Sequence, residues 1–350
     1  MRIGIFYDIR NPQRWFKPFP QFYAETLDHM QAMDELGFEA INVTEHHFDE
    51  DSYCPSVLLW NAVAAARTRR ALLGQEILVL PLHHPVRIAE DLATIDNLSN
   101  GRAWLRVGQG APGPTEFAAF GIEGRRRGDR LGEYLDIMRR CFTDEEFSYD
   151  GRYYKLRNVR VMPKAVQVPH PPIFVVATPG TPSMERVVRM GFHAIYATGG
   201  PQGLPDVGAW NRWHTAWAET VQRHGKQLSQ FQTSDFTALF VTEDPERDWR
   251  KHRDGVLHAL QFYRKRGSTR WAYDTPEDIP NWQNLFQTPE DAVTYLRRQY
   301  GDHPPTWLIL WANRPGMTYE ESTAHHRLFM EKVAPHLKDL GSGSGGVMRC

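Results

Sequence analysis

The sequence has little of what marks several common protein classes. Only three cysteines occur in 350 residues, Cys54, Cys141 and Cys350, too few and too scattered for a disulfide framework, which indicates a reducing compartment. Basic and acidic residues nearly balance, 41 against 42, so the basic excess expected of a nucleic-acid or membrane-surface protein is missing. No apolar run approaches the roughly 18 residues of a membrane helix. Because the N-terminus also lacks a signal-peptide pattern, we expect a soluble, cytoplasmic protein.

What is present is an alternation of strand-like and helix-like segments. Helical periodicity fills most gaps between eight short apolar runs. The runs are Arg2–Tyr7, Ala40–Val43, Leu72–Leu80, Ala103–Val107, Ile173–Ala177, Ala194–Ala197, Thr237–Thr242 and Thr306–Trp311. Eight strands with intervening helices predict one (β/α)8 TIM-barrel domain over residues 1–340, with a doubly wound open sheet as the alternative. The Gly-Ser-rich residues 341–350 are expected to be a flexible tail.

Local signals mark the ends of several elements. Residues 85–100 have apolar side chains at helical spacing, with a proline in the first turn and a glycine just past the end. A capping box from Thr318 to Glu321 is predicted to start the last helix. Residues 147–154 place an Asp-Gly turn between aromatic runs, which predicts a hairpin. Residues 271–285 are rich in Trp, Pro and Asp and are predicted to form a lid or an ordered loop over the barrel mouth.

The tripeptide Glu45-His46-His47 directly follows the predicted strand Ala40–Val43. In a parallel barrel, the carboxyl ends of the strands point their side chains into the reaction site. An imidazole titrates near neutral pH, so it can hold, give or take a proton during turnover. His46 is therefore a catalytic candidate, and two histidines that merely end a strand and bind nothing are the alternative.

Several further motifs occur in order along the chain. They are Glu45-His46-His47-Phe48, Leu78-Val79-Leu80-Pro81, His84–Asp91, Leu98–Arg102, Pro171–Ala177 and Phe329-x-x-x-Val333-Ala334-Pro335. With these motifs, residues 1–338 resemble the bacterial luciferase-like family of flavin-dependent monooxygenases. The resemblance implies a (β/α)8 barrel, in agreement with the strand count.

The resemblance also implies flavin mononucleotide (FMN), taken up reduced, with its ring at the barrel mouth and its phosphate near the fourth and fifth strands. A phosphate needs backbone N–H groups at a helix start, small hydroxyls and a guanidinium. Ala177, Gly180, Thr181 and Ser183 lie in the turn between the fifth strand and the next helix, where Gly180 allows close approach and the hydroxyls can donate. Arg130 matches the family's phosphate-binding arginine. An ordinary turn and a solvated surface charge are the alternatives.

Three positions near the expected flavin ring depart from the family pattern and complete the cofactor-binding candidates. Some relatives carry a cysteine at the place of Gly108, and Gln109 can offer the cofactor only a neutral amide. Relatives commonly have a small residue in place of Glu76, next to an unusual cis peptide bond that lies against the flavin ring. Glu76 is expected either to accept a hydrogen bond from the ring or from a substrate, or to turn outward.

The implied reaction begins with reduced FMN and O2, which form a flavin C4a-peroxide that oxidises a small organic substrate such as an aldehyde or a ketone. Family likeness gives His46 the role of holding the peroxide and transferring a proton. His47 should point the other way along the strand and is predicted to be structural. The family also suggests a homodimer and, for a two-component enzyme, a separate NAD(P)H-flavin reductase.

Three other functions stay open. The deazaflavin F420 of some relatives would replace FMN, with hydride transfer in place of oxygen chemistry. A flavin-binding or storage protein without turnover would share the fold. A metal-dependent hydrolase barrel would use His46, His47, His83, His84 and Glu76, but adjacent histidines on one strand diverge and leave few ligands for a common ion.

Overall fold

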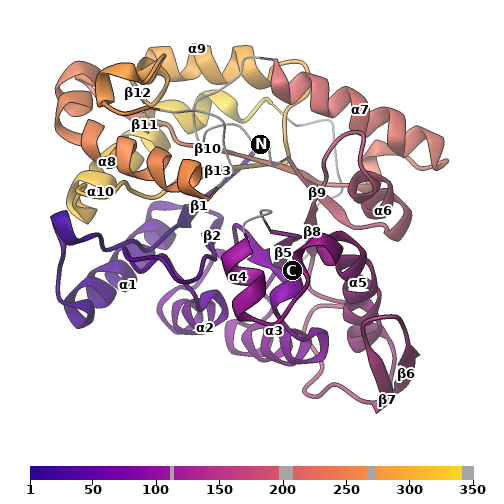
Figure 1. The fold of residues 1–350 in the computed structure, drawn as a ribbon. Helices are drawn as coiled ribbons and strands as arrows, with labels where there is room; N and C mark the ends of the chain where they lie inside the picture. The colour runs from indigo at the N-terminus through magenta and orange to yellow at the C-terminus, as the bar shows by residue number, and fades with distance from the viewer. Residues whose placement is uncertain (111–113, 197–207, 267–272, 341–350) are drawn as a thin grey trace.

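The structure, a computed structural model, describes residues 1–110, 114–196, 208–266 and 273–340. Its parallel strands form a barrel with helices around the outside (Figure 1). The barrel strands are β1 (Arg2–Tyr7), β2 (Ala40–Val43), β3 (Leu72–Gln75), β4 (Leu78–Val79), β5 (Leu105–Gly108), β8 (Ile173–Val176), β9 (His193–Ile195), β10 (Thr233–Thr237) and β13 (Trp307–Trp311). Outside the barrel, β6 (Phe147–Asp150) pairs antiparallel with β7 (Lys155–Val159), and β11 (Phe240–Val241) pairs with β12 (Phe286–Gln287). The predicted tail, 341–350, lies outside the described residues.

One interrupted strand closes the ring. The strand order β3-β2-β1-β13-β10-β9-β8-β5-β4 places β3 and β4 at opposite ends of the sheet. In the sequence these strands are halves of one segment, separated by the cis peptide bond Glu76–Ile77. β3 pairs with β2 and β4 with β5, and a bridge from Leu73 to Ala103 links the two neighbours. The segment is therefore a single third barrel strand, and the predicted (β/α)8 barrel is confirmed, cis bond included.

Most of the helices cover the outside of the barrel (Figure 1). The helices are α1 (Phe19–Leu36), α2 (Val57–Arg67), α3 (Pro85–Ser99), α4 (Pro114–Ala119), α5 (Arg127–Thr143), α6 (Pro182–Met190), α7 (Ala209–Arg223), α8 (Pro245–Lys265), α9 (Pro289–Tyr300) and α10 (Tyr319–Leu328). The predicted end of α3 is confirmed, because Asn100 and Gly101 both take the left-handed conformation. The capping box of Thr318 and Glu321 is also confirmed at α10. Within the described residues, no helix is both long and apolar enough to cross a membrane.

The predicted seventh strand, Thr237–Thr242, was wrong. The seventh barrel strand is β10, which begins four residues earlier than predicted and pairs with β9 and β13. The apolar residues 240–241, which belonged to the predicted strand, pair instead in the small β11–β12 sheet. β10 carries polar residues that its neighbours satisfy. Ser234 accepts a hydrogen bond from Arg106 at 2.9 Å, and Asp235 accepts one from Tyr300 at 2.6 Å. A polar sequence can therefore form a buried strand here.

Two predicted excursions have different outcomes. The hairpin at residues 147–154 is confirmed as β6 and β7. Of the predicted lid, residues 271–272 lie outside the described part of the chain. The rest packs against α8, where Trp282 stacks on Trp249 with ring centroids 5.1 Å apart. Closure of this segment over the barrel mouth stays a prediction.

Large and small residues alternate inside the barrel. Trp104, Phe174, Trp307 and Trp311 belong to one buried cluster that fills the interior. Gly74 faces Trp104 so closely that a Cβ atom would lie 2.3 Å from its indole ring. A glycine is therefore needed for the tryptophan to fit, since interiors are close-packed.

A buried ion pair sits among these rings. The Nε of Arg106 donates to Glu76 at 2.9 Å, and Asn42 also donates to this carboxylate at 3.4 Å. The side chains of Arg106 and Glu76 are 0% and 4% exposed. Burial raises the pKa of Glu76 and lowers that of Arg106, while each partner's charge opposes the change in the other. Each charge is therefore tolerated because the other is present.

We predict that Glu76→Ala lowers the free energy of unfolding by about 3–5 kcal/mol, because it leaves the Arg106 guanidinium buried without a counter-charge. Urea denaturation of purified protein measures this change. The matched control is Asp91→Ala, which breaks the largely exposed Arg87–Asp91 pair and should cost less than about 1 kcal/mol. Equal losses in the two variants would contradict the proposed role of burial.

Candidate active site

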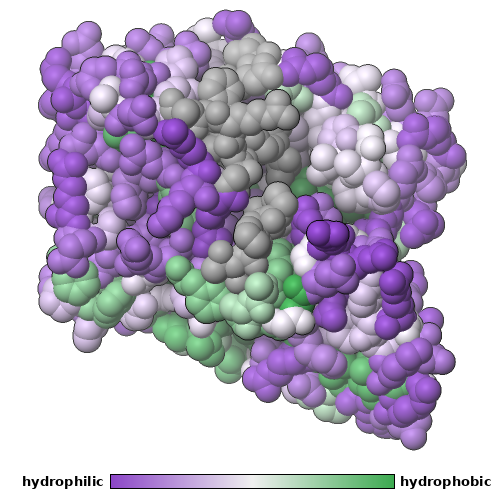
Figure 2. All heavy atoms as spheres, in the orientation of Figure 1, coloured by the Kyte–Doolittle hydropathy of each residue, from purple (hydrophilic) through white to green (hydrophobic). Residues whose placement is uncertain are grey.

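The carboxyl ends of the barrel strands meet at one mouth, as expected for parallel strands closed into a ring. His46 follows β2, Gly108 ends β5, and Ala177 follows β8. Hydrophobic residues gather around α4 and α2 on the face shown in Figure 2. Phe48, which is 63% exposed, lies 5.8 Å from Phe120 just after α4. This end of the barrel therefore combines polar strand ends with apolar surface.

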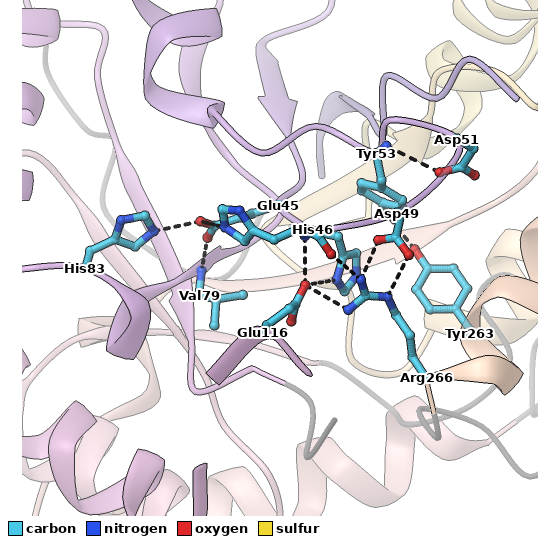
Figure 3. Close-up of polar contacts among 11 residues, drawn as sticks. Glu45, His46, Asp49, Asp51, Tyr53, Val79, His83, Glu116, Tyr263 and Arg266 are labelled. Carbon is cyan, nitrogen blue, oxygen red and sulfur yellow. Dashed lines mark hydrogen bonds and ion pairs between the residues drawn. The ribbon is translucent and has the colours of Figure 1, made fainter. Parts of the chain in front are cut away.

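His46 is held by a carboxylate on one side and by aromatic rings on the other (Figure 3). Its Nδ1 lies 3.2 Å from Oε1 of Glu116. The ring centroids of Tyr53 and Phe262 lie 4.6 Å and 5.2 Å from that of His46, both edge to face. The imidazole is therefore fixed in orientation and largely shielded, with 14% of its side chain exposed.

Glu116, on α4, connects His46 to a wider charge network. The same Oε1 atom accepts the backbone N–H of His47 and the Nη1 of Arg266, each at 2.8 Å. Arg266 also pairs with Asp49 and donates to the carbonyl of His47 at 2.6 Å. Burial favours the protonated acid, but His46 above all, and then the N–H of His47 and the charge of Arg266, outweigh it and lower the pKa of Glu116 to about 2.

The ionised state of Glu116 decides the tautomer of His46. A carboxylate only accepts hydrogen bonds, so the Nδ1 of His46 must carry the hydrogen. The Nε2 atom of the neutral ring then carries the lone pair. Nε2 is therefore the atom through which His46 can take up or release a proton.

His47 points away from His46, as predicted, and joins a separate buried cluster. Its Nε2 lies 2.9 Å from Oε1 of Glu45, which the Nε2 of His83 also approaches at 2.7 Å. The backbone N–H of Val79 donates to the other oxygen of Glu45. Burial raises the pKa of Glu45, but the two imidazoles outweigh it and lower the value. The cluster ties the ends of β2 and β4 together, which agrees with a structural role for His47.

The metal-hydrolase alternative has no matching geometry in the described residues, where no group of three or more His, Cys, Asp or Glu side chains is arranged to hold a metal ion. Of its five candidate ligands, His47 and His83 share Glu45. His46 turns to Glu116, and Glu76 to Arg106 inside the barrel.

Gly108, the last residue of β5, packs against the third barrel strand, and Gln109 packs against the start of α5. A Cβ atom on Gly108 would lie 2.1 Å from Cδ1 of Ile77, so the isoleucine occupies the space of a side chain at this position. The amide oxygen of Gln109 lies close to Gly128, in the first turn of α5. Glu76 turns inward, and Arg106 already binds its carboxylate. Contact of these residues with a flavin stays a prediction.

The turn between β8 and α6 is tightly ordered by its own hydroxyls. Thr181 is the N-cap of α6, donates to the carbonyl of Thr178 at 2.8 Å and lies 2.8 Å from the hydroxyl of Ser183. Gly180 has a φ of 68°, and nothing lies within 4 Å of where its Cβ would be. Ala177 is buried and accepts a hydrogen bond from Trp213 at 2.6 Å. The backbone at Gly180 is therefore open to a ligand.

Arg130 is the fourth residue of α5. Its guanidinium carbon is 5.2 Å and 5.4 Å from the ring centroids of Tyr153 and Tyr154. Within the described part of the chain it makes no ion pair or hydrogen bond, so its donors are available. Arg186 of α6 lies against Gly132 of α5, which shows that the two helices adjoin.

Several side chains at these positions were not predicted. Glu116 and Arg266 hold His46 in place, Arg106 pairs with Glu76, and Arg186 lies between α5 and α6. Glu116 is 70 residues from His46 in the sequence. The one signal in the sequence is position, because Glu116 follows shortly after a barrel strand.

A model of the family described as luciferase-like monooxygenase matches residues 1–298. The chain belongs to this family. The predicted resemblance to luciferase-like monooxygenases is thereby confirmed.

Two of the similar proteins whose names state an activity are the following. The oxygenase component of a flavin-dependent trigonelline monooxygenase from Acinetobacter baylyi is 29% identical over 158 residues, 45% of this chain and 44% of the relative. Limonene 1,2-monooxygenase from Rhodococcus erythropolis is 23% identical over 330 residues, 91% of this chain and 82% of the relative. Several curated relatives are matched over about half of their length, 44% to 49%.

Solved structures share the fold over nearly the whole chain. The monooxygenase RslO1 from Streptomyces bottropensis has a TM-score of 0.81 and 25% identity, covering 96% of this chain and 99% of its own. The oxygenating constituent of 3,6-diketocamphane monooxygenase from Pseudomonas putida, in complex with FMN, has a TM-score of 0.76 and 18% identity, with coverage of 96% and 98%. An F420-dependent secondary alcohol dehydrogenase has a TM-score of 0.69 and 15% identity, with coverage of 97% and 99%. The last two likenesses concern the luciferase-like fold alone.

The low pKa of Glu116 predicts a pH-dependent contribution to stability. The pKa of Glu116 is about 2 in the folded protein, below the ordinary value of 4.5. The ionised carboxylate therefore stabilises the fold above pH 4.5, and this stabilisation is lost as the pH falls toward 2. Glu116→Gln should therefore be less stable than the wild type at pH 6, with the difference shrinking between pH 5 and pH 3 in urea denaturation.

The control for this experiment is Asp150→Asn. Asp150 pairs with Lys155 at the surface, where its side chain is 67% exposed, so its removal should have a much smaller effect on stability. A difference for Glu116→Gln that does not change with pH would contradict the assignment of an ionised Glu116.

Proposed function

We propose that the protein is a flavin-dependent monooxygenase that uses reduced FMN and O2 to oxidise a small organic substrate. The observation that carries this proposal is the oriented imidazole of His46 at the mouth of a luciferase-like barrel. The named monooxygenases among the relatives support it. His46 is the proposed catalytic residue.

The residues present fit a flavin phosphate. Arg130 makes no ion pair or hydrogen bond with the residues that the structure describes, the N-terminus of α6 lies at the end of the turn that follows β8, and Gly180 leaves its backbone accessible. Ser183 would complete the anion site with its hydroxyl, and Thr181, whose hydroxyl donates to Thr178, would hold the turn in place around the phosphate. Gly108, Gln109, Ala177 and Glu76 are the remaining proposed cofactor neighbours.

Bound reduced flavin would supply the two electrons that activate oxygen. The protein's part is to orient the reacting groups, exclude water and move a proton. Tyr53 and Phe262 shield one side of His46, and Glu116 holds Nδ1, so that proton transfer takes place at Nε2. An imidazole with one fixed nitrogen acts as a directed donor or acceptor.

The deazaflavin F420 is the second candidate cofactor, supported by the similar fold of F420-dependent enzymes. Reconstitution with each cofactor, followed by absorbance spectroscopy, separates FMN from F420. Oxygen uptake with reduced FMN that increases on addition of candidate substrates separates a monooxygenase from a flavin-binding protein without turnover. The oxygenase component among the relatives supports a separate NAD(P)H-flavin reductase as the source of reduced flavin, and a homodimer in the cytoplasm stays a prediction.

We predict that His46→Ala lowers substrate-dependent oxygen consumption by about 10²–10⁴-fold, because it removes the group that transfers a proton. Turnover with reduced FMN, measured by an oxygen electrode, gives the result. His84→Gln is the control, because this exposed histidine precedes α3 and packs beside Tyr154. Unchanged turnover in His46→Ala would remove the assignment.

We predict that Arg130→Ala weakens FMN binding about 10- to 150-fold, the effect of losing a charge-assisted contact of about 1.5–3 kcal/mol. Riboflavin, which lacks the phosphate, should bind both proteins equally. Arg139→Ala is the control on the same helix, since Arg139 pairs with Asp136 at the surface. Equal losses for FMN and riboflavin would place the phosphate elsewhere. Fluorescence titration measures both affinities.

A further inference from the structure

Buried polar atoms without a hydrogen-bonding partner gather at the ends of β1 and β13. Among the described residues they are Oδ2 of Asp8, Nη1 of Arg10, Nε1 of Trp311 and Nε of Arg314, while Nη2 of Arg10 pairs with Asp51. β1 and β13 are paired neighbours, with Phe6 opposite Trp311, so the residues after these strands meet at the barrel mouth. Buried polar groups normally have partners. A group of orphaned atoms at a mouth therefore indicates a place for a ligand.

Arg314 is the most exceptional member of this group. It is 2% exposed, and its guanidinium carbon lies 3.7 Å from the ring centroid of Trp311. Burial lowers its pKa to about 10 although Asp8 opposes the change, so the side chain stays charged at neutral pH. Among the described residues, no carboxylate oxygen lies within 4.0 Å of its nitrogens. A buried charge without a close partner is costly.

The other cations nearby have carboxylate partners. Arg10 donates from Nε to Asp51 at 2.7 Å. Arg14 pairs with Asp254 at 2.6 Å, and Lys17 pairs with Glu25. Arg314 is thus the cation whose donors are left for an incoming acceptor.

A cavity of about 540 Å³ opens beside Arg10 and Arg314. This volume is in the range of small-molecule sites. Trp15, Phe22 and Met317 give it apolar surface, and none of the described residues that line it is acidic. The cavity therefore suits a molecule with an apolar body and an anionic end.

One aromatic layer separates this group from His46. The ring centroid of Tyr53 lies 4.6 Å from that of His46 and 5.3 Å from the guanidinium carbon of Arg10. The ring centroid of Phe262 is placed in the same way, 5.2 Å from that of His46 and 4.4 Å from the guanidinium carbon of Arg10. The ring of Tyr263 likewise lies between those of His46 and Trp311, with centroids 6.1 Å and 6.4 Å away. The carboxylate of a ligand anchored at Arg314 and Trp311 would thus lie one aromatic layer away from the candidate catalytic imidazole.

We propose that Arg314 and Trp311 bind the carboxylate of the substrate, which makes the substrate class a small organic acid with a flat, apolar body. This inference rests on the proposed function, since it names the substrate of that site. The guanidinium and the indole N–H donate to the two carboxylate oxygens. A carboxylate fits better than a dianionic phosphate because Arg314 is a single positive charge with no carboxylate within 4.0 Å among the described residues. Asp8 repels an incoming anion, yet it lies 4.0 Å from Arg10, which offsets its charge.

The probe for this proposal is benzoate, with benzamide as its neutral counterpart, and calorimetric titration of the flavin-free full chain gives both affinities. Benzoate should bind the wild type at least about 10-fold more tightly than benzamide. Arg314→Met should lose this preference, while Arg14→Gln should keep benzoate affinity within about twofold, because Arg14 lines the same cavity but is paired with Asp254. Trp311→Phe keeps a large ring and loses the indole donor, so it should weaken benzoate binding about threefold or more. This variant tests the proposal if Arg314→Met does not fold.

The proposal would be overturned if the wild type bound benzoate and benzamide with equal affinity. It would also be overturned if Arg314→Met still preferred benzoate over benzamide as strongly as the wild type does. Displacement of benzoate by equimolar inorganic phosphate would also overturn it, because the site would then bind any small anion and not a carboxylate with an apolar body. Binding of reduced FMN is titrated on the same preparations. Loss of benzoate selectivity with flavin binding intact refutes this inference alone, whereas absent flavin binding with benzoate selectivity intact refutes the proposed function alone.

Discussion

Closure of the parallel sheet through residues 72–79 is the constraint on which the rest of the structure depends. The first half of this segment pairs with β2 and the second half with β5. Without it, the sheet would have two open edges with unpaired backbone groups. Because it closes the ring, the ends of β2, β4, β5 and β8 face one another, and His46 lies at the same mouth as the turn around Gly180.

Buried charge in this protein is held mostly by partners that are distant in sequence. Glu116 joins His46, His47 and Arg266, while Arg106 joins Glu76 inside the barrel. Such pairs offset the cost of removing charge from water, and their geometry fixes the side chains that they contain. Orientation of His46 is thus a result of electrostatics as much as of its place after a strand.

Much of the fold could be predicted from the sequence, because β1 and β2 are apolar runs with clear ends and the capping residues of α10 act locally. The seventh strand could not, since Ser234 and Asp235 are polar and find their partners on β5 and α9. The same limit applies to the site. The position of His46 at the barrel mouth could be predicted from its place after a strand, and that of Thr181 from its place before a helix. Glu116 and Arg266 are defined by contacts that only the closed barrel creates.

Ile77 and Gly108 share one volume. The isoleucine side chain fills the space that a β-carbon at residue 108 would need, so the two positions are linked sterically although they lie on different strands. A lineage that gained a thiol at residue 108 would have to exchange Ile77 for a smaller residue in the same step. Among homologues, these two columns should therefore vary together, with bulk moving from one strand to its neighbour.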